Sequence, residues 1–365
     1  IEGIYLKNLQ GKIINHNHSF NAEIEFDNKI INIKKNKNID FDNFIIPGFV
    51  DLHCHGGNGF DTMGGLKSIE NLSFYHLKNG TTTLLPTTIT ASLEDTKKAL
   101  KGLNNFINEN KTKTNILGVH LEGPFISPFK LGAQPNQTQL PNLDFIKNIE
   151  KEAKIKVITI APELDEAEKL IKDLIKHNIN IQIGHSVCSY ESCIKIMKNN
   201  KIGFTHLYNA MSGNHHRKPG VLTAALLKGE YAEIICDLFH VKAENIHLAK
   251  KNIPKLYAIT DAISATGMKD GEYNFGNNKI VKKNNQAFIN DDILAGSVVN
   301  MHETFKNLIK INFSLNEAVA MTSYNAAKYM EEKNIGKIEE GYYSNFVVID
   351  KNLNIKGVYL QGNLV

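Results

Sequence analysis

The sequence predicts an α/β protein, a (β/α)8 barrel of the TIM type with a small β-sandwich domain formed by both chain ends. Two observations support this prediction. Between residues 45 and 262, eight short β-branched runs recur, each followed by a polar stretch long enough for a helix. Strands that alternate with helices favour parallel βαβ units, and eight such units are typical of a closed barrel. Both chain ends alternate apolar and polar residues instead.

The barrel strands are predicted from runs of Val, Ile, Leu and Thr that end in polar residues. The eight runs span residues 45–53, 81–88, 115–123, 156–163, 180–186, 203–210, 232–237 and 256–262. Between them, segments with helical apolar spacing and good helix formers predict helices, for example at 93–107, 164–177 and 190–200.

The chain ends predict antiparallel strands. Residues 3–37 and 341–365 alternate in polarity and carry Gly, Asn and Asp at the expected turns. Neither end is long enough to bury a core alone, so we expect them to pair into one domain. The predicted division is a small β-sandwich domain of residues 1–46 and 337–365, with the catalytic barrel at residues 47–336.

Composition narrows the class of function. A formal net charge of +4 is too small and too evenly spread to indicate a nucleic-acid or membrane partner. The four cysteines lack CxxC spacing, which argues against a disulfide framework and a thiolate zinc site. With no signal peptide and no apolar window of membrane-spanning length, we expect a soluble, cytoplasmic protein.

Residue types that bind metals or transfer protons stand at the ends of six of the eight predicted strands. In a barrel of this kind, the loops at these ends form the active site. The two histidines of the first strand are separated by one residue, so their side chains point to the same side. Histidine and carboxylate ligands suit zinc, iron, manganese or cobalt. The positions are His53, His55, Glu122, His185, His206, His240 and Asp261.

Each candidate also has a structural alternative. The histidines could be neutral loop or core residues held by single hydrogen bonds, and the two carboxylates could cap helices. The place of Asp261 at the end of the eighth strand favours a general base. In the basic loop 213–220, Arg217 could bind phosphate through its planar guanidinium, or it could simply be solvated. We assign no role to His76 or His120.

Several motifs in fixed order are familiar. "PGFVDLHCHG", "GTTTLLPT", "HLEGPF", "GHS", "THLYNAM", "DLFHV", "TDA" and "LAGS" resemble the N-acetylglucosamine-6-phosphate deacetylase family of the amidohydrolase superfamily. The resemblance runs from about residue 46 to the end of the chain. "HLEGPF" and "THLYNAM" distinguish this family from dihydroorotases, hydantoinases and nucleobase deaminases. The end of the fourth strand, "TIAPE", also lacks the lysine that many of those relatives carbamylate, and Glu122 would take over its role.

The resemblance implies a metal-dependent hydrolase. Glu122, His185 and His206 would hold the principal metal ion, and the first-strand pair, His53 and His55, would add a second site. One or two divalent ions per subunit are therefore expected, of zinc, iron, manganese or cobalt. Asp261 would be the catalytic acid–base.

The resemblance also implies a set of substrate contacts. Arg217 would reach the sugar phosphate in the neighbouring subunit, which implies a homodimer. Gln134 stands where some members carry histidine, so any contribution of that histidine to polarising the carbonyl would come from a neutral amide or from the metal. The implied set is Ala133, Gln134, Asn209, Ala210, Arg217, His240, Leu294, Ala295, Gly296 and Ser297.

The implied activity is hydrolysis of the N-acetyl group of N-acetyl-D-glucosamine 6-phosphate in amino-sugar catabolism and cell-wall recycling. Two enzymatic alternatives stay open at this point: deacetylation of N-acetylgalactosamine 6-phosphate, or hydrolysis of another cyclic amide. The non-enzymatic alternative is a metal-containing sugar-phosphate sensor.

Overall fold

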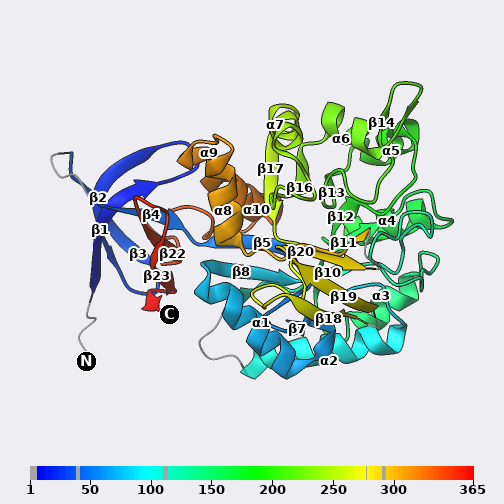
Figure 1. The fold of residues 1–365 in the computed structure, drawn as a ribbon, viewed down its shortest axis with the longest axis horizontal. Helices are drawn as coiled ribbons and strands as arrows, with labels where there is room; N and C mark the ends of the chain where they lie inside the picture. Colours follow the sequence, from blue (N-terminus) through cyan, green and yellow to red (C-terminus); the bar gives the residue numbers. More distant parts are fainter. Residues whose placement is uncertain (1–5, 38–41, 110–113, 277, 290–292) are drawn as a thin grey trace.

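A computed structural model describes residues 6–37, 42–109, 114–276, 278–289 and 293–365. Eight parallel strands form a barrel in the predicted order along the chain (Figure 1). They are β5 (Phe49–Cys54), β8 (Thr81–Pro86), β10 (Val119–Glu122), β11 (Ile155–Ile160), β12 (Asn180–Ile183), β13 (Ile202–Phe204), β16 (Tyr231–Ile235) and β17 (Lys255–Ile259). The short strand β9 (Asn115–Ile116) extends the pairing of β8.

The barrel closes through pairing and single bridges. β5 pairs with β8, β10 to β13 form one parallel sheet, and β16 pairs with β17. A parallel bridge between Thr87 and His120 joins the β5–β8 pair to the sheet of β10 to β13. Leu207 N–H donates to the Glu233 carbonyl at 2.8 Å beyond β13, and Asp261 N–H donates to the His53 carbonyl at 2.9 Å between β17 and β5. The predicted (β/α)8 barrel is therefore confirmed.

Helices follow the strands and cover the outside of the barrel (Figure 1). The segments predicted to be helical at 164–177 and 190–200 contain α4 and α5, and α2 begins where predicted and ends two residues later. Side-chain oxygens of Asn142, Ser189 and Asn300 accept backbone N–H groups at the starts of α3, α5 and α8, which favours helix initiation at these points. The helices are α1 (Leu66–Lys78), α2 (Leu93–Glu109), α3 (Leu143–Ile149), α4 (Ala167–Lys176), α5 (Tyr190–Met197), α6 (Val221–Lys228), α7 (Ala243–Asn252), α8 (Met301–Lys310), α9 (Leu315–Val319) and α10 (Asn325–Tyr329), with η1 (Thr62–Gly64) and the π-helix η2 (Ala320–Tyr324).

Both chain ends contribute strands to one curled sheet beside the barrel (Figure 1). β4 and β22 pair antiparallel and so join the two ends. The ring of Phe26 meets the rings of Phe346 and Tyr359 at centroid distances of 5.0 and 5.6 Å, so the two halves of the sheet face each other across a shared core. The domain boundaries near residues 46 and 337 stay a prediction. In sheet order the strands are β24 (Asn363–Leu364), β23 (Ile355–Leu360), β22 (Phe346–Asp350), β4 (Asn43–Pro47), β1 (Lys7–Ile14), β2 (Ser19–Phe26) and β3 (Ile30–Lys35).

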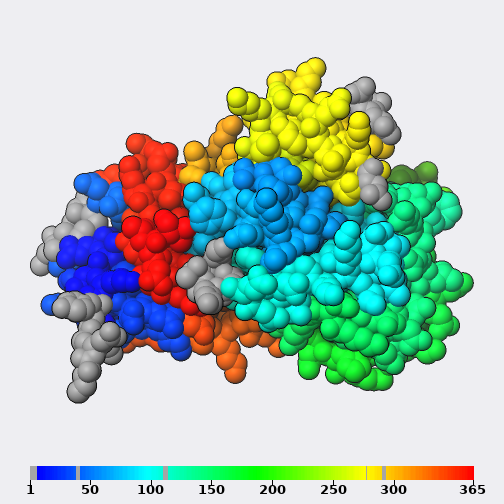
Figure 2. All heavy atoms as spheres, turned by 90° about the horizontal axis from the view of Figure 1, so that it is seen from below, coloured from blue at the N-terminus to red at the C-terminus, as the bar shows by residue number. Residues whose placement is uncertain are grey.

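A small antiparallel sheet after β17 was not predicted. It consists of β18 (Gly271–Phe275), β19 (Asn278–Lys283), β20 (Gln286–Ile289) and β21 (Ile293–Leu294). Figure 2 shows it as a yellow projection on the barrel. Phe275 and Ile280 pack with Ile263 and Ala295 in a separate apolar cluster that fixes this sheet to the barrel.

Short hairpins complete the loops at the carboxyl ends of the strands. β6 (Gly56–Gly57) pairs with β7 (Phe60–Asp61), and β14 (Asn214–His215) pairs with β15 (Lys218–Pro219). Every residue of β5 and β8 is buried, as expected for parallel strands covered on both faces. In the described part of the chain, no helix has the length and apolarity needed to cross a bilayer.

Candidate active site

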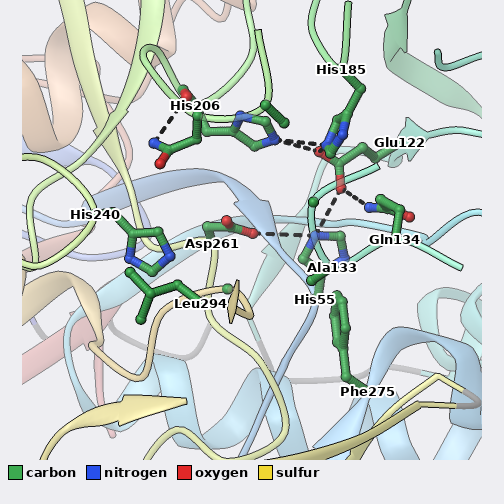
Figure 3. A pocket seen from close by; sticks show the side chains of 14 residues that line it. His55, Glu122, Ala133, Gln134, His185, His206, His240, Asp261, Phe275 and Leu294 are labelled. Carbon is green, nitrogen blue, oxygen red and sulfur yellow. Dashed lines mark hydrogen bonds and ion pairs between the residues drawn. The ribbon is translucent and has the colours of Figure 1, made fainter. Parts of the chain in front are cut away.

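Most of the predicted site residues line one cavity at the carboxyl ends of the barrel strands, and His53 lies buried behind His55 (Figure 3). His53 and His55 project from and just beyond β5, and Glu122 is the last residue of β10. His185, His206 and Asp261 each lie two residues beyond the last residue of their strands, β12, β13 and β17. Residues from five strands thus meet at the place where a barrel of this type forms its site.

One carboxylate oxygen of Glu122 faces two histidines. Its Oε1 lies 3.2 Å from Nε2 of His185 and 2.9 Å from Nε2 of His206. The two Nε2 atoms are themselves 3.0 Å apart. Three ligand atoms of types that bind metals therefore surround one point, and all three side chains are buried.

The other oxygen of Glu122 faces the first-strand histidines. Its Oε2 lies 3.0 Å from Nε2 of His55 and 3.5 Å from Nε2 of His53. Asp261 Oδ1 lies 3.3 and 3.5 Å from the same two nitrogens. His53, His55 and Asp261 form a second group of potential ligands, with Glu122 between the two groups.

Hydrogen bonds to the other ring nitrogen orient three of the histidines. Nδ1 of His185 donates to the Lys130 carbonyl at 2.7 Å, and Nδ1 of His55 donates to the Thr87 carbonyl at 3.2 Å. Nδ1 of His53 donates to Oε2 of Glu233 at 2.9 Å. Because an imidazole that donates from Nδ1 keeps a lone pair on Nε2 when neutral, these contacts aim three basic nitrogens toward the Glu122 carboxylate.

The backbone at the ligands is unusual. His185, His206 and Asp261 adopt positive φ angles of 47°, 27° and 49°. Left-handed conformations of non-glycine residues cost about 1–3 kcal/mol each and concentrate at functional sites. The strand ends therefore turn these side chains inward at the expense of local stability.

The electrostatics of the site favour positive charge. Burial lowers the pKa of His53, but Glu122, Glu233 and Asp261 outweigh burial and hold that pKa well above its usual value. Burial raises the pKa of Glu122, but His53 and the hydrogen bonds from His185 and His206 bring it well below its usual value. The cavity thus places carboxylates where a bound cation would complete the charge balance.

These residues fit a divalent metal ion. Imidazole nitrogens and carboxylate oxygens are the ligands of zinc and similar ions, and the Nδ1 contacts supply the outer hydrogen bonds that such ligands need. Among the described residues that line the cavity, none is lysine. Glu122 lies between the two ligand groups, with Oε1 facing His185 and His206 and Oε2 facing His53 and His55.

The structure brings most of the predicted substrate contacts to the same cavity. Its lining includes Ala133, Gln134, Asn209, Ala210, His240, Leu294 and Gly296. In Figure 3, His240 and Leu294 lie on the opposite side of the cavity from Glu122 and Gln134.

Three predicted contacts lie outside the cavity lining. Arg217 is exposed on the β14–β15 hairpin. Ala295 is buried in the apolar cluster beneath β18 to β21, and Ser297 is buried with its hydroxyl donating to the Thr260 carbonyl at 2.5 Å. The backbone of the "LAGS" segment is thus near the site, but two of its side chains face the interior.

Sequence reasoning missed several residues of the site. Phe275 lines the cavity and packs its ring against His55 at a centroid distance of 5.2 Å. Glu233 is fully buried under His53. His120 packs against His53, with its Nδ1 donating to the Leu52 carbonyl and its Nε2 bonded to the Thr159 hydroxyl. Glu233 stands in the apolar run "YAEIIC", where a charged residue was a signal that could have been noticed.

Known proteins resemble this chain along nearly its whole length. It matches the amidohydrolase family over residues 44–365. The N-acetylglucosamine-6-phosphate deacetylase of Lysinibacillus sphaericus is 35% identical over 331 residues, which cover 88% of this chain and 85% of that protein. The N-acetylgalactosamine-6-phosphate deacetylase of Escherichia coli O157:H7 is 29% identical over 332 residues, 88% of this chain and 87% of that protein.

A solved structure agrees closely with the fold. The crystal structure of N-acetylglucosamine-6-phosphate deacetylase from Thermotoga maritima superposes with a TM-score of 0.92 at 31% identity, covering 98% of this chain and 99% of that one. The barrel, its ligand cluster and these similarities lead to one conclusion. This chain belongs to the amidohydrolase family.

Proposed function

We propose that this protein hydrolyses the acetamide of N-acetyl-D-glucosamine 6-phosphate to D-glucosamine 6-phosphate and acetate, as part of amino-sugar catabolism. The observation that carries the proposal is the cavity in which Asp261 faces the cluster of Glu122, His185 and His206. The relatives from Lysinibacillus sphaericus and Thermotoga maritima, which match most of this chain, carry this activity in their names. The protein is thus a hydrolase of amide C–N bonds.

Glu122, His185 and His206 would hold the principal divalent ion, and His53 and His55 would contribute to a second. The ligand types fit zinc, iron, manganese or cobalt. When bound, such an ion supplies Lewis-acid activation of the acetamide carbonyl and of water.

Asp261 moves the proton in this mechanism. Its carboxylate lies at the ligand cluster with Oδ1 directed toward the first-strand histidines, and its pKa is lowered because His53 and His55 outweigh the effect of burial. The carboxylate therefore starts ionised and takes a proton from the attacking water. It then delivers that proton to the amide nitrogen as the C–N bond breaks, so the products are a free amine and acetate.

Gln134 lines the cavity and also forms a hydrogen bond with Glu122. Its Oε1 accepts the Thr90 backbone N–H at 2.7 Å, and its Nε2 donates to Glu122 Oε2 at 2.5 Å. The amide is fixed by these two bonds and holds the Glu122 carboxylate in place. It has one N–H left with which to contact an acyl oxygen.

The sugar phosphate would lie at the end of the cavity away from Glu122, near His240, Asn209 and Ala210. Arg217, on the exposed β14–β15 hairpin, would reach the phosphate bound in the neighbouring subunit of a homodimer. Remote binding energy of this kind orients the amide at the ligand cluster, so an unphosphorylated sugar should react more slowly as well as bind more weakly. The cytoplasmic location stays a prediction from the sequence.

Acetate release tests the proposal. The wild type should release acetate from N-acetylglucosamine 6-phosphate, and Asp261→Asn should lower kcat by about 100- to 10,000-fold while the ion at Glu122, His185 and His206 is retained and thermal unfolding stays close to wild type. Asp173→Asn, which removes a surface carboxylate paired with Lys176, is the matched control and should keep full activity. A near wild-type rate for Asp261→Asn would overturn the assignment.

The galacto epimer is the second candidate, because an N-acetylgalactosamine-6-phosphate deacetylase is 29% identical to this chain. Kinetics on both epimers side by side decide between them. A higher kcat/KM for the galacto substrate would replace the first proposal.

A further inference from the structure

Asp237, just beyond β16, is bound tightly to His240. Its Oδ2 accepts a hydrogen bond from the ring Nδ1 of His240 at 2.6 Å. Its Oδ1 accepts the backbone N–H groups of Phe239 and His240, each at 2.9 Å. The carboxylate is buried, and neither oxygen can move without breaking a bond to the same short turn.

The bond to Asp237 determines what His240 presents to the cavity. Nδ1 is occupied by the carboxylate, so Nε2 is the ring nitrogen left for a ligand. Figure 3 shows His240 on the side of the cavity away from Glu122. A neutral ring that donates from Nδ1 would offer only a lone pair at Nε2, whereas a protonated ring offers an N–H donor and a positive charge.

The surroundings favour the protonated ring. Burial lowers the pKa of His240, but the hydrogen bond and charge of Asp237, with a smaller effect of Asp261, raise it above its usual value. Asp237 itself is not among the residues that line the cavity. The hydrogen-bonded path from Asp237 to a ligand in the cavity therefore runs through His240.

We infer that Asp237 is a positioning residue, which holds His240 as a fixed N–H donor and cation for the phosphate end of the substrate. The inference rests on the proposed function and deepens it. A charge-assisted hydrogen bond from a preorganised imidazolium is well suited to a phosphate oxygen, because the ring is already oriented before the ligand arrives.

A double-mutant cycle tests the inference. Asp237→Asn keeps an oxygen for the two backbone N–H groups but removes the charge that stabilises the protonated ring. It should lower kcat/KM for N-acetylglucosamine 6-phosphate roughly tenfold. In a His240→Asn background the same change should alter kcat/KM less than about twofold, because the residue through which Asp237 acts is gone.

Controls separate the possible failures. Asp173→Asn should leave kcat/KM unchanged. If the wild type releases no acetate, the proposed function fails. If the wild type is active but Asp237→Asn has the same kcat/KM, or if the two effects simply add in the double mutant, the inference is overturned. Should Asp237→Asn not fold, Asp237→Ser, which is smaller and keeps an oxygen for the backbone, enters the same cycle with the same expected outcomes.

Discussion

Replacing Glu233 by glutamine should destabilise the ion-free protein although the new side chain has nearly the same shape. Oε2 of Glu233 accepts hydrogen bonds from His53 Nδ1 at 2.9 Å and from the His206 backbone N–H at 3.3 Å. Oε1 accepts from Gln182 Nε2 at 2.9 Å and lies 3.5 Å from the Tyr257 hydroxyl. All four partners donate, so a carboxylate satisfies them and an amide cannot.

The size of the effect follows from the donors left without an acceptor. Turning the Gln182 amide to compensate would break the bond in which its Oε1 accepts the Thr205 hydroxyl at 2.8 Å and would require that hydroxyl to accept instead. Whichever way the new amide turns, its NH2 group meets donors. A stranded buried donor costs about 1–3 kcal/mol, and breaking a buried pair typically costs about 3–5 kcal/mol. We therefore expect Glu233→Gln to lower the free energy of unfolding by about 3 kcal/mol.

Urea unfolding of metal-stripped protein at pH 7 measures this change. Glu230→Gln is the matched control, because Glu230 lies near the start of the same strand, is exposed and pairs with Lys255 at the surface. Its removal should cost less than about 1 kcal/mol. If Glu233→Gln unfolded within about 0.5 kcal/mol of the wild type, the argument that the carboxylate orders His53 would be refuted.

The remaining predictions concern the ion, a buried histidine and the subunit contact. Zinc at about 100 times its dissociation constant should raise the free energy of unfolding of stripped protein by about 2.7 kcal/mol, and His185→Asn should abolish most of that gain. Burial lowers the pKa of His76 to about 4. Below about pH 6.5 the unfolded chain therefore binds a proton that the folded chain does not, and this group should lower the free energy of unfolding by about 2 kcal/mol between pH 7 and 5. His76→Gln should show a correspondingly flatter pH dependence of urea unfolding. Arg217→Ala and Asp261→Asn subunits that are refolded together should recover roughly a quarter of wild-type acetate release. Random pairing of a homodimer makes half of the dimers mixed, and each mixed dimer has one site with both Asp261 and the neighbouring Arg217 intact. No recovery would contradict the shared site.

The barrel could be predicted because its signal is repeated along the chain. Each parallel strand is buried on both faces, so it appears as an apolar run such as "KVITI", and each helix that follows has its own spacing and polar face. The sheet β18 to β21 was missed for the opposite reason. Its strands are short, and in β19 the buried Ile280 and Lys282 alternate with exposed residues, so residues 271–294 contain no apolar run of the kind that predicted the barrel strands.

The ligands of the cavity could be predicted because they stand at strand ends, where topology alone brings them together. Contacts between buried side chains from distant parts of the sequence could not be predicted in this way. Glu233 meets His53 across a separation of 180 residues, and the bond between His240 Nδ1 and Asp237 depends on how both side chains are oriented within a turn. The placement of Ala295 and Ser297 away from the cavity likewise depends on how the loop packs, because adjacent residues of one short segment face opposite directions.

The central claim is that amide hydrolysis depends on a divalent ion held by Glu122, His185 and His206. The most direct measurement is acetate release from N-acetylglucosamine 6-phosphate by metal-stripped protein, before and after zinc, iron, manganese or cobalt is added back, with Glu122→Gln measured in parallel. We predict no release without metal, recovery with at least one ion in the wild type, and no recovery in Glu122→Gln. Full activity of the stripped wild type, or equal recovery in the variant, would contradict the claim.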